Sequence, residues 1–185
     1  MKHTGGFGIE GSDGRRVPDP TALERHGPLV SVIVTPSAAV MKVLAESGKT
    51  AAQARVHLLI DTGAELTSIH DDVIQTLGVQ PVRMQSIGGV SGKPEDYPVY
   101  RLMLHIGVTD GTRSTSLAVA ADVVGMPPSS THPDMRGLIG RDFLRHFRLV
   151  YDGPSGGFEL VEEKITAAPM SRAARRRADR DSRDH

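Results

Sequence analysis

The most informative stretch of the sequence is Leu59-Ile60-Asp61-Thr62-Gly63-Ala64. It places an acid directly after an apolar run, follows the acid with a hydroxyl, and then supplies a glycine that lets a backbone or a ligand come close. A carboxylate at the end of a buried strand has little freedom to move. Two interpretations fit this stretch alone: Asp61 is a reactive group, or it caps the turn by accepting hydrogen bonds from backbone N–H groups.

A second informative stretch is Gly137-Leu138-Ile139-Gly140-Arg141-Asp142-Phe143-Leu144. Two apolar residues between glycines, followed by Arg-Asp and a helical turn, are typical of a specific packing arrangement, although an ordinary strand-to-helix connection also fits. Between the two stretches lies a glycine-rich segment, Ser86-Ile87-Gly88-Gly89-Val90-Ser91-Gly92, with a candidate strand on each side. This combination predicts a hairpin with a mobile tip.

The remaining pattern predicts more strands than helices. β-Branched residues dominate the run 29–34, and Pro28 and Pro36 bracket it, so it predicts a strand. Further strands are predicted over 56–60, 65–69, 82–87, 99–106, 116–124, 147–151 and 157–161, and helices over 38–46, 71–77 and 142–146. The run 126–135 contains three prolines and predicts an irregular connection. The chain is therefore expected to be mainly β.

The composition divides the chain into three parts. Residues 1–28 are rich in glycine and proline without apolar periodicity, which predicts a flexible leader. Residues 29–161 hold the strand pattern and predict one folded domain. Residues 162–185 end in an arginine-rich run that predicts a charged, disordered tail. Because no aromatic residues lie between these arginines, a solvated tail is favoured over a nucleic-acid-binding arm.

Composition excludes several classes of protein. The 185 residues contain no cysteine, so disulfides, thiol nucleophiles and cysteine-bound zinc are excluded, and the cytoplasm is the expected location. Lys plus Arg equals Asp plus Glu at 22 each, so overall charge attracts neither nucleic acid nor membrane. The eight histidines lack the spacing of a zinc helix, and neither a Gly-x-Ser-x-Gly nor a nucleotide-binding glycine pattern is present. No metal or other cofactor is expected.

Taken together and in this order, the Asp61 stretch, the glycine-rich hairpin and the Gly137 stretch resemble those of retroviral-type aspartic proteases, the retropepsin family, and more particularly its bacterial single-domain relatives. The resemblance covers about residues 29–161. It implies a closed acid-protease β-barrel with a flap hairpin and two or three short helices. The predicted helix 38–46 and the connection 126–135 are insertions relative to compact viral members.

The resemblance implies an aspartic-type endopeptidase, a hydrolase that cuts peptide bonds with two carboxylates sharing one proton around a water. The sequence contains a single Asp followed by Thr-Gly or Ser-Gly, at Asp61, so the second acid must come from another copy of the chain. A homodimer is therefore expected, with a polypeptide substrate as the other partner. A non-proteolytic peptide-binding or dimerisation module on the same fold is the alternative.

The family resemblance also assigns roles to the neighbours of Asp61. Thr62 is expected to link the two active-site turns of the dimer, and Gly63 to offer its carbonyl to the substrate backbone. Ala64 provides no hydroxyl donor, so activity is expected to extend from mildly acidic to near-neutral pH. Glu65 and Arg141 match positions that form an ion pair beneath the active site, the alternative being two independent surface charges.

The glycine-rich hairpin is expected to act as a flap that closes over a bound peptide and excludes water. Its expected tip and cleft-facing residues are Ile87, Gly88, Gly89, Val90 and Gly92. A third hypothesis is self-processing, in which a neighbouring dimer cuts the leader near Pro28.

Overall fold

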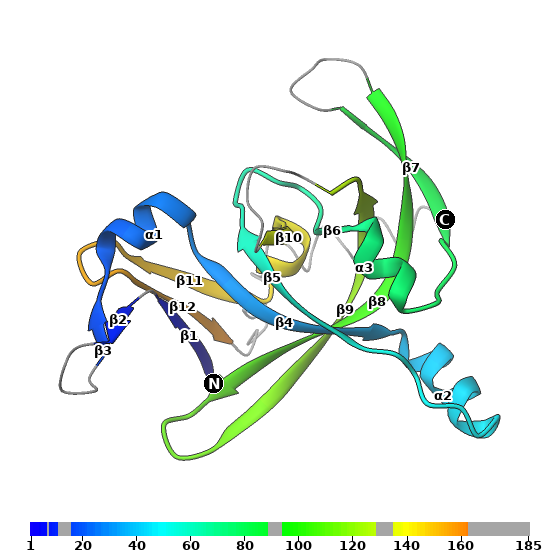
Figure 1. Cartoon of the computed structure of the whole chain (residues 1–185), viewed down its shortest axis with the longest axis horizontal. Helices are drawn as coiled ribbons and strands as arrows, with labels where there is room; N and C mark the ends of the chain where they lie inside the picture. Colours follow the sequence, from blue (N-terminus) through cyan, green and yellow to red (C-terminus); the bar gives the residue numbers. More distant parts are fainter. Residues whose placement is uncertain (7, 11–15, 89–93, 129–134, 163–185) are drawn as a thin grey trace, which may run out of the picture.

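The computed structural model describes residues 1–6, 8–10, 16–88, 94–128 and 135–162 (Figure 1). Its elements in chain order are β1 (Lys2–Gly6), β2 (Gly8–Glu10), β3 (Arg16–Pro18), α1 (Pro20–His26), β4 (Leu29–Pro36), α2 (Ala38–Glu46), β5 (Ala54–Ile60), β6 (Ser68–His70), α3 (Asp71–Thr76), β7 (Arg83–Gly88), β8 (Pro94–Thr109), β9 (Ser114–Met126), β10 (Met135–Ile139), α4 (Arg141–Leu144), β11 (Phe147–Asp152) and β12 (Gly157–Glu162). Within these ranges, no helix is long and apolar enough to cross a membrane.

Six strands close into a barrel. Their order is β8-β4-β5-β10-β6-β9, and β9 pairs back onto β8. The β10–β5 and β6–β9 pairs are parallel, and the other neighbours in the ring are antiparallel. The prediction of a mainly β chain with a closed barrel is therefore confirmed.

Alternating apolar residues explain why these strands enclose a core. In β4 the side chains of Val30, Val32 and Val34 are fully buried, and Ser31 between them lies on the opposite face. β8 repeats the pattern over a longer span, with every second residue from Leu102 to Val108 buried. Because side chains in a strand alternate between faces, one face of each strand forms the barrel interior.

The flap hairpin is built from β7 and the first part of β8. The two strands pair in register from Arg83 opposite Val99 to Gly88 opposite Pro94, and the hairpin projects from the barrel (Figure 1). Ile87 and Gly88 belong to this hairpin. The predicted tip residues Gly89, Val90 and Gly92 lie outside the described residues.

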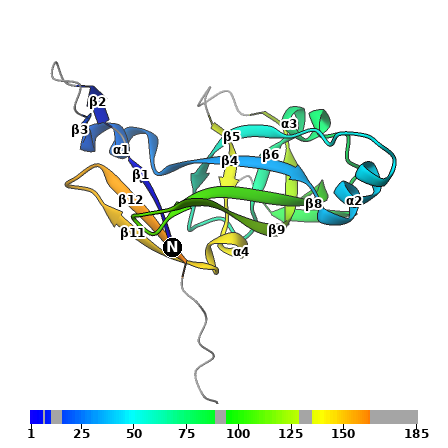
Figure 2. The same ribbon diagram turned by 90° about the horizontal axis from the view of Figure 1, so that it is seen from below.

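The expectation of a flexible leader is wrong for residues 2–6 and 20–26. β1 pairs along its length with β12, which in turn pairs with β11, and β1 also joins β8, so these three strands extend the barrel sheet to one side (Figures 1 and 2). In α1, Leu23 is buried in the core and Asp19 caps the helix through the Ala22 amide. The glycine at position 5 lies against the ring of Phe158, where a side chain would collide with it.

Four helices lie in the described ranges, one more than the sequence predicted. α2 has the predicted bounds, since Ser37 caps its start through the Val40 amide. The helix extends beyond the sheet at one end of the molecule (Figures 1 and 2), and none of its residues is buried. Its apolar side chains Val40 and Val43 are exposed, so α2 adds little to the core. The predicted domain limits at residues 29 and 161 stay predictions, and residues 163–185 lie outside the description.

Candidate active site

Parallel pairing of β5 with β10 brings the two informative stretches together. Ile60 lies opposite Ile139, and both strands end at the same edge of the barrel, so Asp61 and Gly140 follow side by side. The Asp61 amide donates to the Ile139 carbonyl at 3.0 Å. The next turns are also joined, because the Arg141 amide donates to the Ala64 carbonyl at 3.0 Å. The Asp61 and Gly140 stretches, nearly eighty residues apart in sequence, are thus in direct contact.

Glycine is required at two positions of this junction. A Cβ at Gly140 would lie 2.6 Å from the Leu66 carbonyl oxygen and 2.8 Å from the Thr67 nitrogen, both backbone atoms that cannot move aside. Gly137 has a φ of 145°, and a Cβ there would lie 2.8 Å from the Ile69 Cα. The two glycines therefore let β10 pass close to the chain that follows the Asp61 turn.

Asp61 does cap its own turn. Its Oδ1 accepts a hydrogen bond from the Gly63 amide at 2.8 Å, and the Ala64 amide donates to the Asp61 carbonyl at 3.2 Å. The residue is nevertheless half-exposed and faces a cleft. The capping interpretation and the reactive-group interpretation are therefore compatible, because the cap holds the carboxylate in place at the cleft.

The expected ion pair between Glu65 and Arg141 is not formed. The Arg141 Nη1 donates instead to the carbonyl oxygens of Thr62 at 2.8 Å and Gly63 at 2.9 Å. The two carbonyls at the top of the turn lie within reach of a single guanidinium nitrogen. Glu65 is exposed, and its carboxylate has no hydrogen bond or ion pair to any described residue. Arg141 therefore holds the turn directly through its backbone.

A buried threonine joins the two stretches from below, and the sequence analysis missed it. Thr67 is fully buried, and its hydroxyl donates to Asp142 Oδ1 at 2.7 Å and accepts from the Gly140 amide at 3.1 Å. The same carboxylate oxygen accepts from the Phe143 amide at 2.8 Å, at the start of α4. We call Thr67, Gly140 and Asp142 the threonine clamp. The Asp in the Arg-Asp pair was visible in the sequence, but its partner was not.

A cleft of about 720 Å³ lies between the Asp61 turn and the flap hairpin. Of the predicted site residues, seven line it: Asp61, Gly63, Ala64, Glu65, Ile87, Gly88 and Arg141. Thr62 is exposed and is not among the lining residues. Lining residues that the sequence analysis did not single out include Leu66, Ser68, Gln85, Val124 and Met126. The mostly apolar additions come from several strands, so no local sequence signal marked them.

The cleft offers a carboxylate for acid–base chemistry and apolar walls for side chains. The chain brings one Asp61 to this cleft, held by the cap and by the Arg141 contacts to its turn. Across the described ranges, no group of three or more His, Cys, Asp and Glu side chains is placed to hold a metal ion.

Comparison with known proteins gives structural matches alone. No family model and no curated protein matches this chain. The structure is similar to a retropepsin-like aspartic protease from Rickettsia conorii, with 12% sequence identity, 86% of this chain and 93% of that chain covered, and a TM-score of 0.39. It is also similar to the EIAV protease complexed with an inhibitor, with 19% identity, 64% of this chain and 85% of that chain covered, and a TM-score of 0.28.

Proposed function

We propose that this protein is an aspartic endopeptidase whose two catalytic carboxylates come from the Asp61 residues of two identical subunits. The observation that carries the proposal is the position of Asp61, which faces a cleft between its own hydrogen-bonded turn and the flap hairpin. An extended polypeptide is the proposed substrate, bound as an added strand between floor and flap. The proposed location is the cytoplasm.

In the proposed chemistry one carboxyl group is ionised and the other is protonated, and each has its own role. Two like charges at close range cannot both ionise, so the pair holds one proton. The ionised member takes a proton from a water, which attacks the peptide carbonyl, and the protonated member donates to the carbonyl oxygen, giving a tetrahedral diol. The newly protonated member then gives its proton to the amide nitrogen while the other takes one from a diol hydroxyl, so that the C–N bond breaks and an acid and an amine are released. Since the two acids act as one unit, their titration belongs to the pair.

The surrounding groups would fix the geometry that this chemistry needs. Thr62 has an exposed side chain, and in the proposed dimer its hydroxyl would reach the partner turn. The Gly63 carbonyl accepts a hydrogen bond from Arg141 and keeps a second lone pair for a substrate N–H. Ile87 lines the cleft from the flap and would cover the bound peptide.

The test is cleavage of a randomised peptide library by the wild-type protein and by Asp61→Asn, with mass measured by light scattering. We expect cleavage by a wild-type dimer and none by Asp61→Asn, which keeps the shape of the side chain but cannot serve as the ionised member. Asp110→Asn, an exposed change in the β8–β9 turn, is the matched control and should cleave like the wild type.

Two outcomes would contradict the proposal. Equal cleavage by Asp61→Asn would remove this residue from the mechanism, and cleavage by a strict monomer would remove the shared dyad. If the wild type binds peptides but cleaves none at any mildly acidic or neutral pH, the alternative of a non-proteolytic peptide-binding module is favoured.

A further inference from the structure

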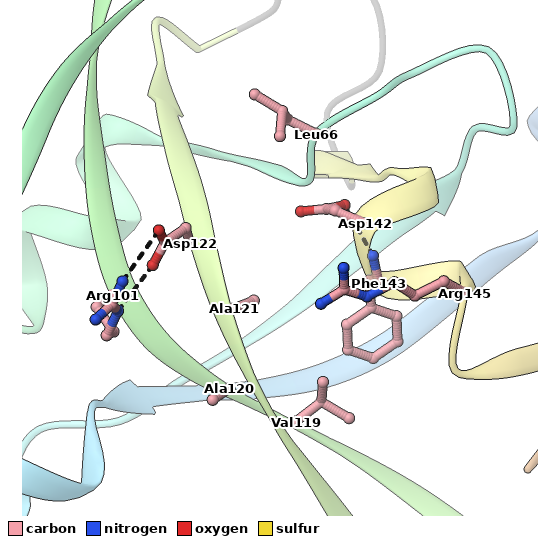
Figure 3. Close-up of a pocket in the computed structure, with 9 residues that line it drawn as sticks. All are labelled: Leu66, Arg101, Val119, Ala120, Ala121, Asp122, Asp142, Phe143 and Arg145. Atoms are coloured by element: carbon pink, nitrogen blue, oxygen red, sulfur yellow. Dashed lines mark hydrogen bonds and ion pairs between the residues drawn. The ribbon is translucent and has the colours of Figure 1, made fainter. Parts of the chain in front are cut away.

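A second cavity lies next to the cleft, between β9 and α4 (Figure 3). Its volume is about 310 Å³, and Leu66 lines both this cavity and the cleft. Leu66 is therefore part of the wall that the cavity and the cleft share. A polypeptide that leaves the cleft past Leu66 would reach this cavity with a residue some distance from the bond to be cut. We call it the distal pocket.

Part of the lining of the distal pocket is apolar. Phe143 and Val119 supply the apolar surface, and the small side chains of Ala120 and Ala121 leave space between β9 and α4. Figure 3 shows the side chains of Asp142 and Arg145 extending from α4 toward β9. The shape suits a side chain with a short apolar stem and a polar end.

The two acids that line the pocket are already engaged. Asp122 receives a two-point hydrogen bond from Arg101, with distances of 2.8 and 3.2 Å, and lies 3.4 Å from an Arg83 nitrogen. In Figure 3 the Asp122 carboxylate points toward Arg101 and away from α4. Asp142 accepts from the Thr67 hydroxyl within the threonine clamp and from the backbone amide of Phe143.

Arg145 is the lining cation whose terminal side-chain nitrogens have no hydrogen-bond partner among the described residues. Its one side-chain hydrogen bond among the described residues runs from Nε to the His146 ring at 3.4 Å, and no described acid lies within ion-pair distance of it. Its terminal nitrogens are therefore available inside the pocket. A guanidinium presents a planar fork of donors that matches a carboxylate in two-point geometry.

We propose that the distal pocket is a specificity subsite that binds a carboxylate of the polypeptide substrate through Arg145. The proposal rests on the proposed function for its substrate class, and it extends that function by naming an acidic residue away from the cut bond. The apolar stem of a glutamate would pack on Phe143, and its carboxylate would accept from Arg145. In a twofold dimer each subunit supplies one such pocket, so the preference is expected on both sides of the cut.

The experiment compares glutamate with glutamine at each position around the cut in randomised peptides with amidated ends. For the wild type we expect glutamate to be favoured about five- to tenfold at one position on each side of the cut, a preference between that of an exposed ion pair and that of a buried charge-assisted hydrogen bond. For a matched peptide pair the difference should appear in KM rather than kcat, because the contact is the same before and during the reaction. Added salt should reduce the preference for glutamate, because salt screens the attraction between the two charges.

Three variants test whether the preference for glutamate depends on Arg145. Arg145→Gln should bring the glutamate-to-glutamine ratio close to one, and Arg145→Lys should keep part of the preference. Arg113→Gln removes the same charge from the turn that precedes β9 and should leave the ratio as in the wild type. Equal use of the two residues by the wild type, or an unchanged ratio in Arg145→Gln, would overturn the proposal.

A binding experiment separates this proposal from the proposed function. If no peptide is cleaved, the same library is passed over the immobilised wild-type protein and over Arg145→Gln, and the retained peptides are sequenced. Enrichment of glutamate that depends on Arg145 would support the distal pocket although the protease proposal had failed. Absence of that enrichment would overturn the pocket. If peptides with free C-terminal ends are preferred and peptides with amidated ends are not, the pocket binds the terminal carboxylate of the chain, and the proposal of a glutamate side chain is overturned.

Discussion

Replacing Thr67 by valine should loosen the active-site junction without changing its shape. Valine has nearly the same volume as threonine, so packing is retained, and the two hydrogen bonds of the threonine clamp are lost. The Gly140 amide is buried and would have no partner, which costs about 2 kcal/mol. Asp142 is half-buried and can still bind water, so its loss is about 1 kcal/mol. The free energy of unfolding should therefore fall by about 3 kcal/mol.

Urea unfolding of the two proteins measures this difference directly. A loss of this size corresponds to a fall in Tm of roughly 10 °C for a domain of this length. Peptide cleavage, under the proposed function, should fall with it because the clamp joins the Asp61 turn to α4. Thr67→Ser keeps the hydroxyl and loses a methyl group, so its cost should be about 1 kcal/mol.

The control is Thr115→Val, the same substitution on the exposed face of β9. It should change the free energy of unfolding by less than about 0.5 kcal/mol. If Thr67→Val is as stable as this control, the clamp contributes nothing to stability and the reasoning is refuted. A larger loss in Thr67→Ser than in Thr67→Val would also refute it, since it would assign the effect to packing.

Three further predictions follow from the site and its surroundings. Arg141→Ala removes two hydrogen bonds to turn carbonyls and should lower peptide cleavage and dimer stability together; a fully active, fully dimeric variant would show that the turn holds itself. Gly137→Ala forces a side chain onto a φ of 145° against β6 and should cost about 3 kcal/mol or more in urea unfolding, whereas Gly111→Ala, in an open hairpin turn, should cost less. Burial lowers the pKa of His70 from its ordinary 6.5, against the attraction of Asp72, so protonation favours the unfolded chain and stability should fall as pH drops below about 6.5; equal urea midpoints at pH 7.5 and 5.5 would contradict this.

Local patterns in the sequence were sufficient for most of the barrel. The alternation of apolar residues in β4 and β8 marks a buried face, and that signal needs only the segment itself. The bounds of α2 were predicted for the same reason, because Ser37 and Gly48 act on the helix ends that they adjoin. The order of the Asp61 stretch, the flap hairpin and the Gly137 stretch was likewise visible.

Other features could not be read from the sequence because their cause lies elsewhere in the chain. β1 has no apolar alternation of its own and is held by pairing with β12, at the other end of the described chain. Two of the glycines in the segment predicted as a flexible leader belong to this strand, and one of them, Gly5, accommodates the Phe158 ring. The apolar side chains Val40 and Val43 of α2 are likewise exposed, because nothing in the described chain buries them.

The amino-acid sequence alone determined which groups are available for chemistry: a single Asp-Thr-Gly-Ala turn, a glycine-rich hairpin and a Gly-Leu-Ile-Gly-Arg-Asp segment, in that order. Which of these groups meet, and through which atoms, was decided by the tertiary structure. The parallel alignment of β5 and β10 brings Arg141 to the carbonyls of the Asp61 turn rather than to Glu65, and it places Thr67 under Asp142. A side chain pairs with whatever the closed barrel puts within about 3 Å of it, and sequence separation carries no information about that distance.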